Sequence, residues 1–303
     1  MAHVATIVCD PAAPALTGEL IARASSILTD PAPPQWLDPG IAADIVFEPR
    51  ESESANTTAK LLRAALEDTA ADIFVQPLKG RRKKLLLADM DSTMIGQECI
   101  DELAGEIGKR GEVAAITERA MRGEIAFEPA LCARVALLKG IDHAAILRVI
   151  ESNITLTRGG LELVQTMRKN GAYTALVSGG FLVFTAAIAK KLGFDEHRAN
   201  KLLFDADGKT SGLAAEPVLG QEAKLSALQS LREKLGLSAE ETLAVGDGAN
   251  DLSMLEAAGL GVAFRAKPKV AAAAHARVDH ADLTALLYAQ GFRREEFATR
   301  ADL

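Results

Sequence analysis

The chain has 303 residues, of which 49% are hydrophobic and 25% are charged, and its 34 Lys and Arg against 41 Asp and Glu give a net charge of −7. These values are ordinary for a folded globular protein and exclude intrinsic disorder as its main state. The acidic balance argues against a protein that binds nucleic acid or anionic membranes, because positive patches hold both. The length suggests about two domains at roughly 150 residues each.

The first 80 residues have the pattern of a small α+β domain. Apolar runs predict strands and helical periodicity predicts helices in the order Val4–Cys9 (strand), Ala15–Leu28 (helix), Asp44–Phe47 (strand), Thr57–Asp68 (helix) and Asp72–Gln76 (strand). The Pro-rich break over residues 31–39 leaves room for one more short strand near Trp36. The order is then β-α-β-β-α-β, which predicts a ferredoxin-like domain over residues 1–80.

A basic run, KGRRKK at Lys79–Lys84, follows this domain. The run is short, and we interpret it as a solvent-exposed linker rather than a nucleic-acid-binding or targeting patch. The most apolar strand of the chain begins directly after it, so a second domain is predicted over residues 81–303.

After the linker, short apolar strands alternate with helical stretches. These strands are LLLAD from Leu85, YTALVS from Tyr173 and TLAVGD from Thr242. The alternation predicts a parallel sheet with helices on both faces. The all-helical stretch at about 97–151 is longer than one crossover needs and is predicted to be an inserted helical cap. A β-hairpin is predicted near Lys201–Leu213, where Asp207 and Gly208 form a strong turn signal.

Cysteine usage and segment composition indicate a cellular compartment. The three cysteines, Cys9, Cys99 and Cys132, are widely spaced and fit neither a disulfide framework nor a Cys-based zinc site, which favours a reducing compartment. No basic region precedes the first apolar run, and no window offers ~20 uninterrupted apolar residues. We therefore expect a cytoplasmic protein with no secretory signal and no transmembrane helix.

The strand LLLAD leads into two aspartates two residues apart, Asp89 and Asp91. In an extended segment their side chains point to the same side, at the carboxyl end of the sheet, where open α/β sheets bind ligands. Two carboxylates this close need a cation or hydrogen-bond donors to stay ionised together. The pair can therefore supply one ionised nucleophile or metal ligand and one proton donor. Taken alone, the motif could also be an Asp-rich turn that caps a helix.

The segment LAVGDGANDLSML repeats this arrangement with different residues. Asp247 lies at the strand end, and Asn250 and Asp251 follow where they can share one face of the first turn of the next helix. Oxygen ligands grouped in this way suit Mg²⁺. The alternative for Asn250 or Asp251 is a plain helix N-cap.

Two weaker signals complete the set. In ALVSGGF, a strand ends in Ser178 and Gly179 before a helix, where backbone N–H groups and a hydroxyl can approach a phosphate. A plain tight turn explains this segment equally well. Lys224 lies near a helix start, and a single lysine is usually solvated, so only its neighbours could give it a function.

In this order and context, the motifs resemble those of the haloacid dehalogenase-like superfamily of phosphohydrolases over Leu85–Ala281. The resemblance implies a Rossmann-like parallel sheet core with an inserted cap, and a Mg²⁺ cofactor. It makes Asp89 the nucleophile, which forms an aspartyl phosphate and binds Mg²⁺, and Asp91 the general acid and base, whose backbone carbonyl is also a metal ligand. The other implied roles are phosphoryl binding by Ser178, Gly179 and Lys224, direct Mg²⁺ ligation by Asp247, and support of the metal site by Asp251.

Three longer stretches are similar to one family within that superfamily, the phosphoserine phosphatases. They are DMDSTMIGQECIDELA at Asp89–Ala104, MRGEIAFEPALCARVALLKG at Met121–Gly140, and ANKLLFD at Ala199–Asp205. The resemblance implies hydrolysis of O-phospho-L-serine to L-serine and phosphate, the last step of L-serine synthesis. It also implies substrate contacts: Glu98 to the ammonium, Arg134 to the carboxylate as a bidentate fork, Met121 and Phe127 on the apolar side, and Asn250.

Two other functions compete with this one. A sibling phosphatase or phosphotransferase acting on another phosphoalcohol, such as phosphohomoserine, would share every catalytic residue and differ in the cap. A non-enzymatic amino-acid sensor is disfavoured because Asp89 and Asp91 are both present. The N-terminal segment resembles a degenerate ACT-type amino-acid-sensing domain, which implies serine feedback or dimerisation. It has no ligand signature, so structural packing or oligomer contact, as in a homodimer, is its simplest role.

Overall fold

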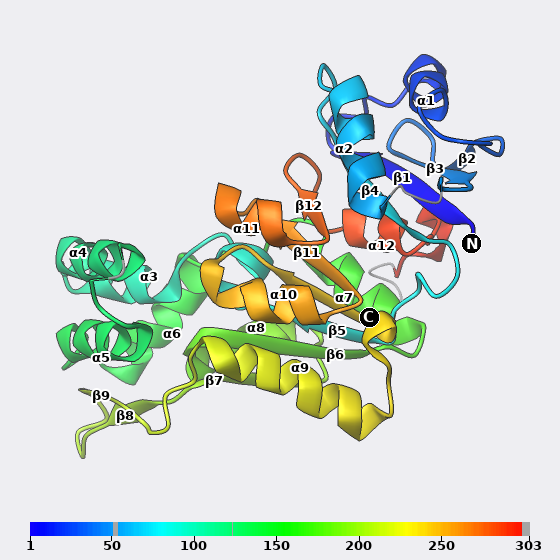
Figure 1. The fold of residues 1–303 in the computed structure, drawn as a ribbon. Coiled ribbons are helices and arrows are strands. Elements are labelled where there is room, and N and C mark those ends of the chain that lie inside the picture. Colours follow the sequence, from blue (N-terminus) through cyan, green and yellow to red (C-terminus); the bar gives the residue numbers. More distant parts are fainter. Residues whose placement is uncertain (51–53, 123, 299–303) are drawn as a thin grey trace.

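The structure is a computed structural model that describes residues 1–50, 54–122 and 124–298, without the side chain of Met121. Its described residues form a four-stranded sheet, a six-stranded sheet and a two-stranded hairpin. Figure 1 shows the four-stranded sheet and its helices on one side of the six-stranded sheet, and a group of four helices at one end of it.

The N-terminal sheet is antiparallel and has the strand order β2-β3-β1-β4. In chain order its elements are β1 (His3–Cys9), α1 (Gly18–Ser25), β2 (Gln35–Asp38), β3 (Ala42–Phe47), α2 (Ala55–Ala65) and β4 (Ala71–Pro77). This confirms the predicted order, including the short strand at Trp36. Helix α1 begins three residues later than predicted because Thr17 is its N-cap, with Thr17 Oγ1 accepting the Leu20 N–H at 3.2 Å.

The six-stranded sheet is parallel throughout, which confirms the predicted core. Its order is β12-β11-β10-β5-β6-β7, with the bounds β5 (Leu85–Ala88), β6 (Tyr173–Phe181), β7 (Glu196–Asn200), β10 (Thr242–Gly246), β11 (Leu260–Phe264) and β12 (Ala276–Val278). Strand β5 lies in the interior of the sheet, between β10 and β6. Its four residues are fully buried, as expected for an apolar strand covered on both faces.

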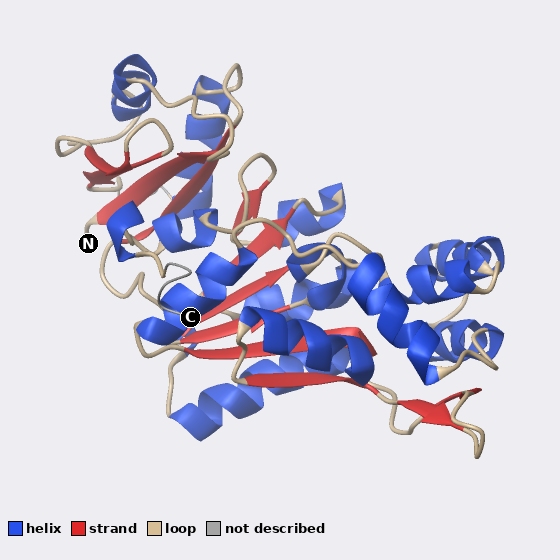
Figure 2. Cartoon of the chain, turned by 180° about the vertical axis from the view of Figure 1, so that it is seen from behind, coloured by secondary structure: helices blue, strands red, loops and turns tan. Residues whose placement is uncertain are grey.

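Helices cover both faces of this sheet (Figure 2). One face packs against α7 (Gly160–Lys169), α8 (Leu182–Leu192) and α12 (Ala285–Ala289). The other face packs against α9 (Gln221–Leu235), α10 (Leu252–Ala257) and α11 (Pro268–Ala273). The sheet is therefore a rigid platform, and the loops at the carboxyl ends of its strands are the natural place for a site.

Four helices form a separate group between β5 and α7: α3 (Cys99–Glu106), α4 (Arg110–Met121), α5 (Phe127–Leu137) and α6 (His143–Ser152). The two segments that connect them to the core lie side by side, joined by a bridge between Ile95 and Leu156. The predicted hairpin is present as β8 (Leu202–Phe204) and β9 (Thr210–Ala214). It packs on this helical group through paired backbone hydrogen bonds of Thr210 with Gly140 and Ile141, each 2.8 Å long. The cap thus consists of four helices and a hairpin.

The basic run between the two sheets is held against the protein, so its interpretation as a solvent-exposed linker is wrong for Arg81. Arg81 Nη1 lies 2.7 Å from Asp44 Oδ2, and the two side chains are 16% and 3% exposed. Lys83 Nζ donates to the Glu240 carbonyl at 2.7 Å. A charge is buried at such a position only when it is paired, and this pairing ties the linker to both sides of the molecule.

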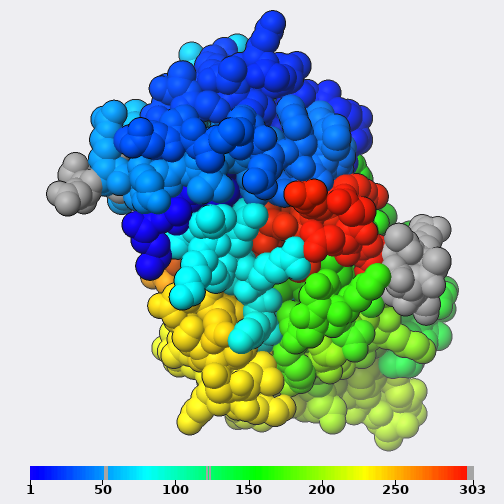
Figure 3. Space-filling model, turned by 90° about the vertical axis from the view of Figure 1, so that its right-hand side faces the viewer, coloured from blue at the N-terminus to red at the C-terminus, as the bar shows by residue number. Residues whose placement is uncertain are grey.

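The N-terminal sheet and the core share one hydrophobic cluster, to which Phe74 and Tyr288 both belong. Buried polar contacts reinforce it: Gln76 Nε2 donates to the Ala289 carbonyl at 2.6 Å, and the Asp72 carboxylate accepts the N–H groups of Asp279 and Ala281, each at 2.8 Å. Figure 3 shows the N-terminal residues seated on the C-terminal segment. Among the described residues, no helix combines the length and apolar composition needed to cross a bilayer.

Candidate active site

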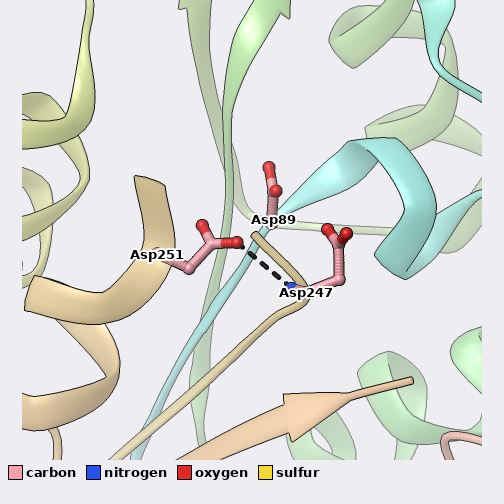
Figure 4. Close-up of side chains that lie close together, drawn as sticks. All are labelled: Asp89, Asp247 and Asp251. Atoms are coloured by element: carbon pink, nitrogen blue, oxygen red, sulfur yellow. Dashed lines mark hydrogen bonds between the residues drawn. The ribbon is translucent and has the colours of Figure 1, made fainter. Parts of the chain in front are cut away.

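The carboxyl ends of three neighbouring strands bring the predicted acidic and small residues together. Asp89 follows β5, Asp247 follows β10, and Ser178 lies in the last part of β6. Because β10, β5 and β6 are adjacent and parallel, their ends meet at one edge of the sheet. Asp251 reaches the same place from the short turn Ala249–Asp251 before α10, as Figure 4 shows.

Three carboxylates form a cluster that could hold a metal ion. Asp89, Asp247 and Asp251 each offer an oxygen, and these oxygens lie within 4.8 Å of one another. Asp89 and Asp251 are buried, whereas Asp247 is partly open to solvent. The side chain of Asp91 is not part of this cluster, so any metal contact from Asp91 would come from its backbone carbonyl, as predicted. Grouped carboxylates with one side open suit a hard divalent cation that keeps some water ligands.

Lys224 has the acidic neighbours that give it a function. It lies in the first turn of α9 and is 2% exposed, with Nζ 2.7 Å from Asp89 Oδ1 and 2.6 Å from Asp251 Oδ1. Burial disfavours its charge, but the attraction of Asp251 and Asp89 outweighs burial and raises the pKa of Lys224 above its usual value. Lys224 is therefore a fixed cation between two carboxylates.

Asp251 has little capacity left for a metal, because both of its oxygens have partners. Oδ1 accepts from Lys224, and Oδ2 accepts the backbone N–H of Gly248 at 2.9 Å. Oδ2 also accepts the backbone N–H of Asp247 at 3.1 Å (Figure 4). A Cβ on Gly246 would lie 2.4 Å from Asp251 Cγ, so only glycine fits there. This arrangement suits the predicted supporting role, in which Asp251 fixes Asp247 and Lys224.

Asp89 and Asp91 lie in different surroundings although they are two residues apart. Asp89 Oδ1 accepts from Lys224 and from the Met90 N–H at 2.7 Å. Asp91 Oδ1 accepts the Cys99 N–H at 3.0 Å, and its Oδ2 accepts from Ser178 Oγ at 3.2 Å. The backbone between them turns sharply, with Ser92 at a left-handed φ of 54°. One carboxylate is thus held by a cation and the other by neutral donors.

The charges of this pocket shift one another. Burial, followed by repulsion from Asp251, raises the pKa of Asp89 above its usual range and raises that of Asp247 to about 6. Burial also raises the pKa of Asp91, against the hydrogen bonds from Cys99 and Ser178. The positive charge of Lys224 neutralises only part of the negative charge that these carboxylates carry when they are ionised, so the pocket favours a further cation.

The cap contributes two charged groups that face the same region. Glu98 lies at the open edge of the site, where Oε1 accepts from Ser92 Oγ at 2.7 Å. Its partial burial against the site and then the charge of Asp91 raise the pKa of Glu98 to about 7. Arg134 in α5 is half-buried, and within the described part of the chain it donates only to neutral oxygens, the Ala130 carbonyl at 3.2 Å and Thr117 Oγ1 at 3.3 Å. Burial lowers the pKa of Arg134, and the attraction of Asp101 and then of Glu98 opposes this shift.

Phe127, the first residue of α5, connects the cap to the loops of the core. A Cβ added to Gly179 would lie 3.3 Å from the ring, and so would a Cβ added to Gly220. The ring therefore sits between these two glycines. Sequence reasoning missed Gly220, because nothing local distinguishes a glycine that faces a distant ring from an ordinary helix-start glycine.

Two further predicted site residues complete the survey. Asn250 folds over the loop, with Oδ1 2.2 Å from where a Gly248 Cβ would be, so a larger residue at position 248 would displace the Asn250 side chain. The side chain of Met121 lies outside the described part of the chain.

A separate cavity of about 230 Å³ lies between the two sheets, near Arg63 and Arg277, away from the acidic cluster. The converging strand ends, and not this cavity, mark the candidate active site.

Comparison with known proteins gives a family match and several similar proteins. The profile of the haloacid dehalogenase-like hydrolases matches residues 86–256. A probable phosphoserine phosphatase of Schizosaccharomyces pombe is 42% identical over 234 residues, which cover 77% of this chain and 78% of that protein. Three further phosphoserine phosphatases are longer, and this chain spans 62%, 64% and 66% of their lengths.

Solved structures agree with these relatives. A HAD-family hydrolase of Salmonella enterica serovar Typhi has a TM-score of 0.82 at 27% identity, covering 97% of this chain and 99% of that one. A substrate-bound phosphoserine phosphatase has a TM-score of 0.64 at 40% identity, covering 68% of this chain and 98% of that one. The predicted family is confirmed: the chain belongs to the haloacid dehalogenase-like hydrolases and, within them, to the phosphoserine phosphatases.

Proposed function

We propose that this protein hydrolyses O-phospho-L-serine to L-serine and phosphate through a phosphoaspartyl intermediate, in the last step of L-serine synthesis. The observation that carries the proposal is the contact of the buried Lys224 with Asp89 and Asp251 at the strand ends. A carboxylate can attack a phosphate dianion only where fixed positive charge offsets the repulsion, and Lys224 supplies such a charge beside Asp89.

Asp89 is the nucleophile, and its two oxygens have separate tasks. Lys224 and the Met90 N–H both bind Oδ1, so among the described residues Oδ2 is left for the reaction. Oδ2 attacks phosphorus, and the bond from phosphorus to the seryl oxygen breaks. Asp91 donates its proton to that oxygen, which leaves as the serine hydroxyl.

The second half of the reaction regenerates the enzyme. Asp91, now ionised, takes a proton from a water molecule that attacks the aspartyl phosphate, and the bond between phosphorus and Asp89 Oδ2 breaks. Its burial and raised pKa suit a group that must hold a proton at one step and release it at another. Ser178, Gly179 and Lys224 hold the phosphoryl oxygens through both halves.

Mg²⁺ is the cofactor that the acidic cluster fits. Asp89 and Asp247 would hold it together with the backbone carbonyl of Asp91, and Asp251 would keep Asp247 in place. Bound Mg²⁺ neutralises charge on the phosphoryl group during transfer. The raised pKa values of Asp89 and Asp247 support this assignment, because a cation is what such a cluster lacks.

The cap selects the substrate by charge. Glu98 binds the ammonium group of phosphoserine and Arg134 binds its carboxylate, while Met121, Phe127 and Asn250 contact the rest. Arg134 supports this role because, among the described residues, its hydrogen bonds go only to neutral oxygens, although its side chain is half-buried. A guanidinium in that state favours a bidentate carboxylate.

The direct test is phosphate release from O-phospho-L-serine, phosphohomoserine and an aryl phosphate, with Mg²⁺ and then with EDTA. We expect metal-dependent turnover with a strong preference for O-phospho-L-serine. Equal, slow turnover of all three esters would leave a phosphatase but overturn the roles of Glu98 and Arg134. A preference for phosphohomoserine would favour the sibling activity.

Organisation and location are part of the same proposal. Residues 1–80 and 81–303 form two domains, with the helical cap at about 97–151. Cys9, Cys99 and Cys132 are all free, which supports a reducing compartment such as the cytoplasm. A homodimer through the N-terminal domain is supported by the edge position of β2 in its sheet, and analytical ultracentrifugation tests it.

A further inference from the structure

Asn200 is a buried polar residue that joins two loops of the active site. It ends β7, is 2% exposed, and pairs with Phe181 of β6 across the sheet. Its amide Nδ2 donates to the Gly179 carbonyl at 2.9 Å and to the Leu219 carbonyl at 3.2 Å, and its Oδ1 accepts the Leu219 N–H at 2.7 Å. One side chain thus provides hydrogen-bond partners for three backbone groups of two loops.

Both loops carry groups that the proposed reaction needs. Gly179 directly follows Ser178, whose hydroxyl donates to Asp91 and accepts the Gly180 N–H at 2.8 Å. Leu219 lies just before α9, in whose first turn Lys224 contacts Asp89. The distance between Ser178 and Lys224 therefore depends on the cross-link that Asn200 makes.

The same cross-link sets the width of the slot in which the Phe127 ring of the cap lies, between Gly179 and Gly220. Gly179 and Gly220 are the two walls between which the Phe127 ring lies. Asn200 bonds to Gly179 itself and to Leu219, the neighbour of Gly220. A change in the cross-link would move both walls of the slot together with the phosphate-binding groups.

Asparagine meets these demands better than the other small polar side chains. Its amide has two N–H donors and one acceptor oxygen on a short stem, which matches two carbonyls and one N–H. An ionised aspartate has no donor and would place negative charge against two carbonyl oxygens. Serine has a single donor and cannot reach both loops at once.

We propose that Asn200 is a positioning residue, which holds the Ser178–Gly180 loop and the start of α9 at the spacing required to bind a phosphoryl group and to seat Phe127. This inference rests on the proposed phosphatase function. Asn200 contacts no reacting atom and acts only through Gly179 and Leu219. Because a displacement of about 1 Å in a catalytic constellation can cost on the order of 100-fold in rate, loss of the cross-link should reduce turnover strongly.

The test compares Asn200→Asp with a matched control, Thr185→Val. Thr185 of α8 is buried, and its Oγ1 forms a 3.0 Å hydrogen bond with Nδ1 of His197, which lies on β7 like Asn200. This bond is away from both loops. The control therefore loses a buried hydrogen bond to β7 without touching the site. We would measure inorganic phosphate binding and Mg²⁺ binding by calorimetry, and kcat and KM with O-phospho-L-serine.

For Asn200→Asp we expect phosphate binding to weaken about tenfold or more and kcat to fall about 10- to 100-fold. Mg²⁺ binding should stay within about twofold, since the acidic cluster lies on β5 and β10. Thr185→Val should match the wild type in all three measurements. If Asn200→Asp does not fold, the same measurements on Asn200→Ser apply, with an expected loss of the same sign.

Phosphate binding and kcat equal to those of Thr185→Val would overturn the proposal. A parallel loss of phosphate and Mg²⁺ binding would also overturn it, because that pattern indicates a general structural defect. Binding of inorganic phosphate does not depend on which ester is the substrate. Failure of the wild type to hydrolyse O-phospho-L-serine would therefore refute the proposed function, and the comparison of phosphate binding between the variants would still test the role of Asn200.

Discussion

The N-terminal sheet and the cap are both attached to the same parallel sheet, but their polar side chains differ in burial and in hydrogen-bond partners. The N-terminal sheet is held by buried polar contacts, such as Asp72 to the backbone after β12 and Gln76 to the end of α12. The substrate-facing residues of the cap, Glu98 and Arg134, are exposed or half-buried, and their bonds go to neutral neighbours. Groups whose hydrogen bonds are satisfied contribute stability, whereas groups left with spare capacity are available to a ligand.

Replacing Arg134 tests the cap side of this comparison and has the largest expected effect. For Arg134→Ala, kcat/KM with O-phospho-L-serine should fall about 100-fold, because a charge-assisted bond to the substrate carboxylate is lost. Hydrolysis of an aryl phosphate, which has no carboxylate, should change little. Steady-state kinetics with both esters measures the difference.

Arg148→Ala is the matched control, since Arg148 lies on α6 of the same cap and is 61% exposed. It should leave kcat/KM unchanged for both esters. Equal losses on both esters in Arg134→Ala would remove Arg134 from substrate recognition.

Replacing Asp72 tests the N-terminal side of the comparison and should lower stability while leaving turnover nearly unchanged. Asp72→Ala leaves buried N–H groups without an acceptor and should lower the free energy of unfolding by about 2 kcal/mol. Turnover should stay within about twofold of the wild type, because Asp72 is remote from the acidic cluster. Urea unfolding followed by circular dichroism measures the change.

The control for this change is Asp68→Ala, which removes an exposed ion pair with Arg23 and should leave the free energy of unfolding nearly unchanged. A large loss of activity in Asp72→Ala at unchanged stability would contradict a purely structural N-terminal contact.

The pH dependence of substrate selection gives a smaller and finer effect. Glu98 binds an ammonium group only when ionised, and its pKa is raised to about 7. As pH falls below about 7, the ionised fraction falls, so kcat/KM for O-phospho-L-serine should fall about tenfold per pH unit. The profile of kcat/KM against pH checks this. In Glu98→Gln that limb should vanish, and the same limb in the variant would assign it to another group.

The elements that carry the reaction could be predicted because their signals are local. Asp89 and Asp247 each follow a short apolar run typical of a buried strand, and parallel strands bring their ends together. The start of α1 was misplaced because a cap at Thr17 outweighed the apolar periodicity of the preceding residues. Local rules of this kind recover the fold better than the exact limits of its helices.

Features that depend on distant partners could not be predicted. Arg81 reads as a solvated linker residue, and only its contact with Asp44, which lies on β3, explains its burial. Asn200 lies in a stretch that matches the family, but a single asparagine at the end of a strand gives no sign that it joins Gly179 to Leu219. The Phe127 slot likewise needs three segments far apart in the chain.

The most direct test of the account is to trap the phosphoryl group on the enzyme. Rapid acid quenching after mixing with radiolabelled O-phospho-L-serine, followed by borohydride reduction, converts an aspartyl phosphate to homoserine at the labelled position. Peptide mass spectrometry should then find homoserine at residue 89, and Asp89→Asn should carry no label. Label on another residue, or turnover with no labelled intermediate in the wild type, would contradict Asp89 as the nucleophile.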